Sequence, residues 1–123
     1  TQYFSQKTEL IKEIHQQLIE HLDQRFTIAE LSKQYLINTS TLKEIFKAVY
    51  GQPIATYMKE FRVRQAMKLL RETNDTIADI ASQVGYQTQG KFSSAFQSIV
   101  KISPREYRKI QGIAPSDSFS KTP

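Results

Sequence analysis

Cysteine is absent from the sequence, which excludes a disulfide framework, a thiolate metal site and a thiol nucleophile. Histidine is scarce. His15 and His21 stand six residues apart on a segment with helical periodicity, so they should lie on opposite sides of a helix without partner ligands. We therefore expect no metal site, no cofactor and no enzymatic activity.

Long hydrophobic runs are also missing, and none approaches the roughly 20 residues that a membrane span needs. The first residues are polar and mixed, unlike a secretory signal, and the chain does not begin with Met. We expect a cytoplasmic piece of a longer protein with no membrane partner. At 123 residues, 39% of them hydrophobic, the chain can form one compact domain or two small ones that share a connector.

The net charge of +5 is unevenly distributed along the chain. Residues 1–23 carry two lysines against four acidic side chains, and basic residues are in excess only in the segments between 24 and 111. A basic surface suits nucleic acid, an acidic protein or simple solubility, so charge alone leaves all three open.

The chain contains an internal repeat, because residues 27–57 and 76–107 resemble each other. Ile28 recurs as Ile77 at an offset of 49, and Phe46 recurs as Phe96 at an offset of 50. One extra residue in the second turn explains why the offset changes from 49 to 50. Two copies of one supersecondary unit imply two similar docking surfaces rather than one active site.

Each copy begins with a helix-start signal. Thr27 with Glu30 forms a capping box, and Thr76 with Asp79 repeats the layout with a shorter acid. Short apolar-periodic helices are predicted over 28–35 and 77–84. A turn follows each of them, and Gly85 in the second turn can take a positive φ.

The second helix of each copy has one apolar and one polar face. The apolar stripes follow i, i+3, i+4, i+7 spacing and comprise Leu42, Ile45, Phe46 and Val49, then Phe92, Ala95, Phe96 and Ile99. The opposite faces interleave lysine with short hydrogen-bonding residues. Glutamine can pair with adenine, lysine with guanine and glutamate with the cytosine amino group. Because this face occurs twice at equivalent places, it favours base recognition over a merely solvated surface.

A predicted helix over 53–72 connects the copies, with Pro53 suited to its first turn. Its apolar surface comprises Tyr57, Met58, Phe61, Ala66, Leu69 and Leu70, and Lys59, Arg64, Lys68 and Arg71 are expected to face away. Twenty residues span roughly 30 Å, close to the ~34 Å between successive major-groove faces. The helix can serve as a stiff spacer or as an ordinary core helix.

Both ends of the chain are simpler. An amphipathic helix carrying Leu10, Ile11, Ile14, Leu18, Ile19 and Leu22 is expected to cover the first core. A short final helix begins at Ser103 with a capping box and Pro104 at its first position. Residues 112–123 are expected to form a flexible tail.

With these residues in view, the chain resembles the DNA-binding domain of the AraC/XylS family of bacterial transcription regulators over residues 8–110. The most specific part is IADIASQVGYQTQGKFSSAFQSIVKISPREYRK, and Tyr57, Arg62, Ala66, Leu69 and Leu70 of the connector also fit. The resemblance implies an all-α fold of seven helices within 1–111. Two helix-turn-helix sub-domains, 8–51 and 73–111, would be joined by a linker helix over 52–72.

The resemblance also implies sequence-specific binding of double-stranded promoter DNA and regulation of transcription, with activation expected. RNA polymerase is a possible partner, and the effector or sensor domain would lie outside this chain. The implied base contacts are Ser40, Lys43, Glu44, Lys47, Gln89, Gly90, Lys91 and Ser94. The implied phosphate contacts are Thr39, Thr88, Lys101, Arg105 and Arg108.

The sequence departs from the family pattern at two turns. Leu36 stands where the family usually has glycine, and a positive φ would cost a leucine ~1 kcal/mol, so we expect this turn to be shaped differently. Lys101 replaces glycine before the last helix and suits either a phosphate contact or a charge at a helix C-terminus. Glu44 needs a specific donor on a recognition face, and Gly90 offers no side chain.

One function of a different class remains open at this point. A helical interaction module could use the basic face to dock an acidic partner such as an RNA polymerase subunit.

Overall fold

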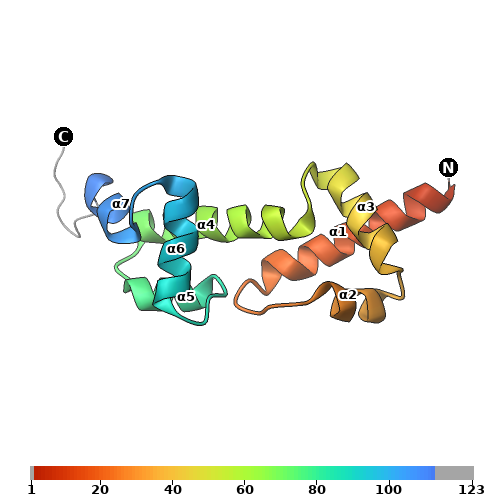
Figure 1. Cartoon of the computed structure of the whole chain (residues 1–123), viewed down its shortest axis with the longest axis horizontal. Helices are drawn as coiled ribbons and strands as arrows, with labels where there is room; N and C mark the ends of the chain where they lie inside the picture. Colours follow the sequence, from red (N-terminus) through yellow and green to blue (C-terminus); the bar gives the residue numbers. More distant parts are fainter. Residues whose placement is uncertain (1, 113–123) are drawn as a thin grey trace. The chain divides into compact units, whose positions relative to one another are not determined.

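The computed structural model describes residues 2–112, and the part of the chain that it describes contains seven α-helices and no strand (Figure 1). The helices are α1 (Gln2–Glu20), α2 (Ile28–Tyr35), α3 (Thr39–Tyr50), α4 (Ile54–Glu72), α5 (Ile77–Gln83), α6 (Gln89–Val100) and α7 (Pro104–Ile110). The predicted all-α fold of seven helices is confirmed. Apart from Gly112, the expected flexible tail lies outside the described residues.

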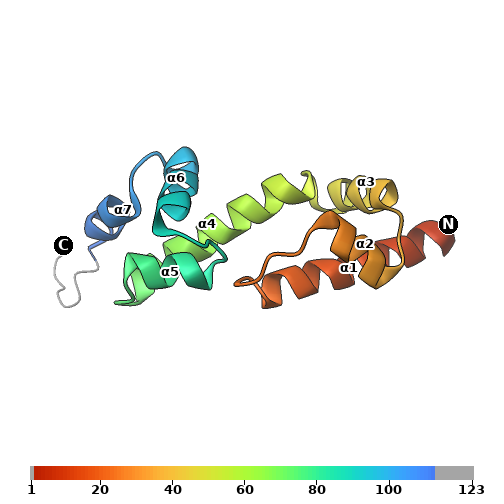
Figure 2. The ribbon, with the colours of Figure 1, turned by 60° about the horizontal axis from the view of Figure 1, so that its bottom comes forward.

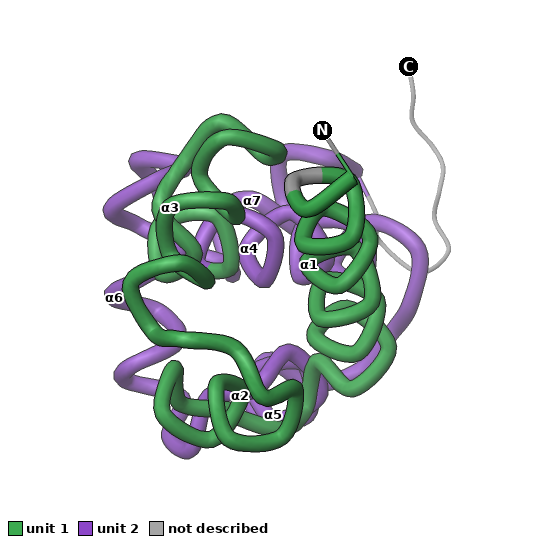
Figure 3. Tube along the Cα trace, turned by 90° about the vertical axis from the view of Figure 1, so that its right-hand side faces the viewer, with its two compact units in different colours: residues 1–58 green, residues 59–123 purple. Residues whose placement is uncertain are grey.

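The chain divides into two compact units, residues 1–58 and residues 59–123 (Figure 3). Helix α4 is continuous, as predicted, but it is shared, because Met58 packs in the core of the first unit and the helix continues into the second. Pro53 lies one residue before the helix, where its carbonyl accepts a bond from the Tyr57 amide at 2.9 Å. The spacer role of α4 between two DNA-contacting units stays a prediction.

The first unit is a three-helix core with the start of α4 added. Helix α1 packs on α3 and α2, and α2 packs on α3 (Figure 2). Its buried side chains come from every helix of the unit and are Ile11, Ile14, Leu18, Leu31, Ile37, Leu42, Ile45, Phe46 and Met58. The predicted stripes on α1 and α3 therefore form this core. Helix α1 extends further toward the N-terminus than the expected start of the first sub-domain at residue 8.

An aromatic cluster joins α1, the end of α3 and the start of α4. His15 stacks on Tyr50 with ring centroids 4.3 Å apart, and a 2.7 Å hydrogen bond joins its Nε2 to the hydroxyl of Tyr57. Burial lowers the pKa of His15. Two effects raise the pKa of Tyr50: chiefly its burial, and to a smaller extent the electrostatic effect of the neighbouring Tyr57. His15 is thus half-buried within this aromatic cluster, whereas His21 is exposed just after α1 ends.

The turn between α2 and α3 contradicts the expectation that Leu36 would force a different shape. Leu36 lies in the left-handed region with φ 52°, and the Ile37 amide donates to the Ser32 carbonyl at 3.0 Å. In the second unit Gly85 has φ 91°, and the Tyr86 amide donates to the Ala81 carbonyl at 2.9 Å. Both turns therefore begin in the same way, and the second is longer before the next helix. The left-handed residue lets the amide of the next residue bond back to the helix, as in a Schellman motif, and here that next residue, Ile37, is buried.

The second unit buries side chains from α4 to α7. Helix α5 packs on α6, and α6 packs on α7. The buried apolar residues are Val63, Ala66, Leu70, Ile80, Ala81, Val84, Phe92, Phe96 and Tyr107. Phe92 and Phe96 lie 5.8 Å apart by ring centroid, and Phe96 meets Tyr107 edge-on at 5.6 Å. The predicted apolar stripe of α6 therefore faces this core, with Ala95 and Ile99 half-buried at its margin.

Helix caps follow the predicted signals with one difference. Thr27 and Glu30 exchange both bonds of a capping box, and so do Ser103 and Glu106. Thr76 caps α5 with its hydroxyl, which accepts from the Asp79 amide at 3.0 Å, but no reciprocal carboxylate bond forms. The side chain of aspartate is one methylene shorter than that of glutamate, which accounts for the missing half.

Three arginines tie α4 to the rest of the second unit. Arg71 does not face away as expected, because its Nη1 donates to the hydroxyl of the buried Tyr107 at 2.8 Å. Arg62 is only 3% exposed, and its Nη1 donates to the carbonyl of Val84 at 2.8 Å. Arg108 donates from Nε to the carbonyl of Leu70 in the last turn of α4, and from Nη2 to the carbonyl of Thr73 just after it, both at 3.1 Å. The bonds from Arg62 and Arg108 satisfy carbonyls at or just after helix ends, which have no partner within their own helix.

Across residues 2–112, no helix is long and apolar enough to cross a membrane.

Candidate nucleic-acid interface

The first candidate interface is the exposed face of α3. Asn38 caps this helix, and its Oδ1 accepts from the amides of Ser40 at 2.8 Å and Thr41 at 3.3 Å. The apolar stripe of α3 is packed in the core, so the other side of the helix is left toward solvent. All four predicted base-contact residues of the first unit are exposed there: Ser40, Lys43, Glu44 and Lys47. Their spacing of three and four residues puts them along one side of the helix.

The second candidate interface is the exposed face of α6. Thr88 caps the helix, its Oγ1 accepting from the Lys91 amide at 3.1 Å. The predicted contacts Gln89, Gly90, Lys91 and Ser94 are all exposed within the first two turns. A Cβ added to Gly90 would meet no atom within 4 Å. The start of α6 is therefore an open polar surface with one lysine.

The two helices correspond residue by residue. Both have 12 residues, and their first residues, Thr39 and Gln89, are 50 apart in the sequence. At this offset Lys47 corresponds to Gln97, which is exposed but absent from the predicted contacts. The same offset of 50, taken from Phe46 and Phe96, would have added Gln97 to the predicted contacts. The predicted sets also fall on partly different helix positions, because Gln89 corresponds to Thr39 and not to Ser40.

The predicted phosphate contacts lie in three different situations. Thr39 and Arg105 are exposed near the starts of α3 and α7, and Thr88 is the exposed N-cap of α6. Amide groups at helix starts are suited to anions. Lys101 is exposed, has φ 76°, and its Nζ donates to the Ser98 carbonyl at 2.9 Å, as a cation at a helix C-terminus does.

Arg108 is the predicted phosphate contact least available to a ligand. It is half-buried, and two of its guanidinium nitrogens already donate to backbone carbonyls. The structure therefore gives it a role in holding α7 to the end of α4, and its phosphate contact stays a prediction.

The exposed side chains of both faces offer hydrogen bonding and cationic attraction. Among the described residues, no three histidine, aspartate or glutamate side chains gather in a way that could hold a metal ion. Two successive helix-turn-helix units, each exposing a polar face on its second helix, define a helix-turn-helix DNA-binding domain as the class of this protein.

Comparison with known proteins identifies the family. The helix-turn-helix domain family matches residues 31–110 of the chain. The chain is 34% identical over 91 residues to the transcriptional activator RhaR of Mannheimia succiniciproducens, covering 74% of this chain and 33% of that protein. It is 38% identical over 84 residues to an AraC-like transcription regulator of Streptomyces lividans, covering 68% of this chain and 28% of that protein. The chain belongs to the AraC/XylS family of transcription regulators.

A solved structure supports the fold independently. The DNA-binding domain of AdpA, crystallised with a target DNA, matches with a TM-score of 0.79 at 21% identity, covering 87% of this chain and 97% of that chain. The family and fold are those of DNA-binding transcription regulators, not of enzymes. The chain spans about a third of the length of the curated relatives described above.

Proposed function

We propose that this chain recognises specific sequences in double-stranded promoter DNA and regulates transcription, chiefly by activation, as the output part of a larger regulator. The observation that carries the proposal is the pair of matched helices, α3 and α6. Each packs its apolar stripe inside its own unit and exposes lysine and hydrogen-bonding side chains on the opposite face. If these faces were merely solvated, there would be no reason for the same kind of polar face to occur on the second helix of both units.

Within the proposal, the exposed faces contact base edges. Ser40, Lys43, Glu44 and Lys47 would read one segment of the major groove, and Gln89, Gly90, Lys91 and Ser94 another. Thr39, Thr88, Lys101, Arg105 and Arg108 would contact phosphates. Phosphate contacts fix the position of the protein and base contacts supply the specificity. We propose that Glu44 accepts a bond from a cytosine amino group, the chemistry that a carboxylate can read.

The relatives support this function over the interaction-module hypothesis. The AdpA domain was solved on its target DNA, and RhaR is named an activator. By analogy, the remainder of the regulator would hold a sensor or effector domain, and RNA polymerase is a further partner to test. A bacterial regulator of promoters would act in the cytoplasm, where the chromosome lies.

Selection of bound sites from random duplexes, followed by affinity measurements against salt, tests the proposal. A selected duplex should bind much more tightly than a random one, and log affinity should fall steeply with log salt concentration because bound phosphates release counterions. Absence of binding to any duplex at low salt would refute the proposal.

The substitution Gln89→Ala tests direct base readout. On the selected site it should cost about 1–3 kcal/mol, the usual range for a lost base contact, and it should relax the preference at one base pair. Gln16→Ala, which changes an exposed glutamine on α1, is the matched control and should leave affinity unchanged. An equal loss on selected and random DNA would show that Gln89 does not read a base.

A further inference from the structure

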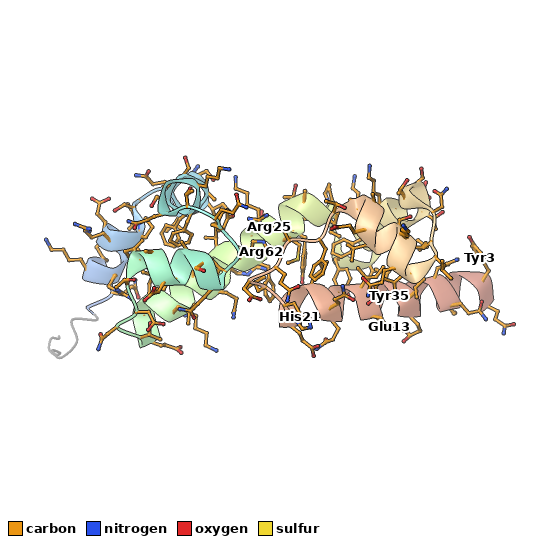
Figure 4. The ribbon with its side chains drawn as sticks, turned by 90° about the horizontal axis from the view of Figure 1, so that it is seen from below. Tyr3, Glu13, His21, Arg25, Tyr35 and Arg62 are labelled. Atoms are coloured by element: carbon orange, nitrogen blue, oxygen red, sulfur yellow. The ribbon has the colours of Figure 1, made fainter. Side chains whose placement is uncertain are left out.

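A groove on the first unit lies outside the candidate DNA interface. It has a volume of about 450 Å³ and is formed by the second half of α1, the following loop and α2. Its walls combine two carboxylates, Glu13 and Glu20, with the aromatic rings of Phe26 and Tyr35. Figure 4 shows Glu13 and Tyr35 close together, with His21 further along the same side. None of the predicted base contacts lines this groove.

The carboxylates of the groove have no cationic partner among residues 2–112. Neither Glu13 nor Glu20 forms an ion pair with another described residue, although Glu20 accepts a 2.5 Å bond from the Gln16 amide group. Burial and then the Glu13 charge raise the pKa of Tyr35. By contrast, Glu9 on the same helix pairs with Lys12 at 3.4 Å. The groove therefore carries negative charge on a chain whose net charge is +5.

The aromatic wall is held in place by hydrogen bonds. The Tyr35 hydroxyl donates to Gln17 Oε1 at 2.5 Å, and the side chains of Gln17 and Gln34 exchange two bonds of 3.1 and 2.8 Å. These bonds link α1 to α2 across the groove. The ring of Tyr35 is thus fixed beside the carboxylates before any ligand arrives, which lowers the entropy cost of binding.

We propose that this groove binds an arginine side chain presented by a second protein. A guanidinium is a planar fork that pairs with carboxylates and also stacks on aromatic rings, whereas an ammonium is a point charge. Arginine is also enriched at protein interfaces. DNA does not fit, because Glu13 and Glu20 would repel its phosphates. The proposal does not depend on what α3 and α6 bind.

A titration followed by NMR on the isotope-labelled chain tests the proposal, with a blocked Gly-Arg-Gly peptide as the probe. Saturable shifts should appear in residues 13–35 around the groove. A Gly-Lys-Gly peptide of equal charge should bind about threefold more weakly, because it loses the stacking on an aromatic face. Shifts that do not saturate, or that map to α3 and α6, would overturn the proposal.

Two charge variants distinguish binding of the arginine peptide in the groove from non-specific electrostatic attraction to the chain. The double substitution Glu13→Gln and Glu20→Gln should weaken the arginine peptide about tenfold, since two exposed ion pairs are lost. Glu9→Gln removes the same kind of charge from the same helix outside the groove and should change the affinity little. An equal effect of Glu9→Gln would refute a specific site. All three positions are exposed, so the folded spectrum should be retained in each variant.

Two further measurements distinguish the other possible occupants. Sedimentation should show no self-association that depends on Glu13 and Glu20, and such self-association would assign the groove to a second copy of this chain. Addition of duplex DNA should leave peptide binding unchanged. Competition between the duplex and the peptide would place nucleic acid in the groove and overturn the proposal. Because the peptide titration contains no DNA, its outcome is separate from that of promoter binding.

Discussion

The substitution Leu36→Gly should stabilise the protein, although it removes a large apolar side chain. Leu36 has φ 52° and ψ 48°, a conformation that costs an L-residue roughly 1–2 kcal/mol. Its side chain is 88% exposed, so little buried apolar area is lost with it. Glycine loses more freedom on folding, which costs roughly 0.4–1 kcal/mol. The net gain in the free energy of unfolding should be roughly 0.5–1 kcal/mol.

Thermal and urea unfolding, followed by far-UV circular dichroism, measures this gain. The melting temperature should rise by roughly 2–5 °C for a chain of this size. Leu36→Ala is the matched control, because it removes the side chain but keeps the Cβ that makes a positive φ costly, so it should give no gain. If Leu36→Gly destabilises the chain, or if Leu36→Ala stabilises it equally, backbone strain at Leu36 is not the cause.

Three further changes test other parts of the structure. Arg62→Met should destabilise the chain by about 1–3 kcal/mol in urea unfolding, because the carbonyl of Val84 loses a buried donor; a neutral result would refute that role. Gly90→Ala should stabilise the chain by about 1 kcal/mol, the helix-propensity difference, since the added Cβ meets open space; a lower melting temperature would show a hidden clash. Burial lowers the pKa of His15 in the folded chain. Its contribution to the free energy of unfolding is therefore fully present above about pH 6.5 and is lost as the pH falls through the lowered pKa of the folded state. His15→Phe should therefore flatten the loss of stability below about pH 6.5, and an unchanged pH profile would place the effect elsewhere.

Much of the fold could be predicted because its signals are local in the sequence. The helix predicted over 28–35 is found as Ile28–Tyr35, where Thr27 and Glu30 cap the start as expected. Apolar spacing of three and four residues also gave the buried sides of α3 and α6. A cap or a stripe is determined by residues within a few turns, so its reading needs no knowledge of the tertiary structure.

The errors arose where distant residues decide the outcome. Leu36 adopts the left-handed conformation at a turn whose next residue, Ile37, is buried in the core, and the local steric penalty alone predicted otherwise. Arg71 was expected to face solvent from its helix position, but the hydroxyl of Tyr107, 36 residues away in the sequence, accepts its hydrogen bond. Long side chains such as arginine can bend along a helix toward a partner, so helix position alone does not fix where they end.

The two candidate recognition helices share a backbone plan but not a chemistry. The turns at Leu36 and Gly85 share a positive φ, and α3 and α6 have the same length, although the turn at Leu36 carries strain that glycine avoids. Two of the differences between α3 and α6, Ser40 against Gly90 and Glu44 against Ser94, fall on exposed positions. A substitution at such a position usually changes stability by less than about 0.5 kcal/mol. Side chains such as Glu44 and Gly90 are therefore free to be set by what the helix contacts and not by folding. If the proposed function holds, the two units can differ in the DNA they read while keeping one architecture, and promoter recognition is expected to be asymmetric.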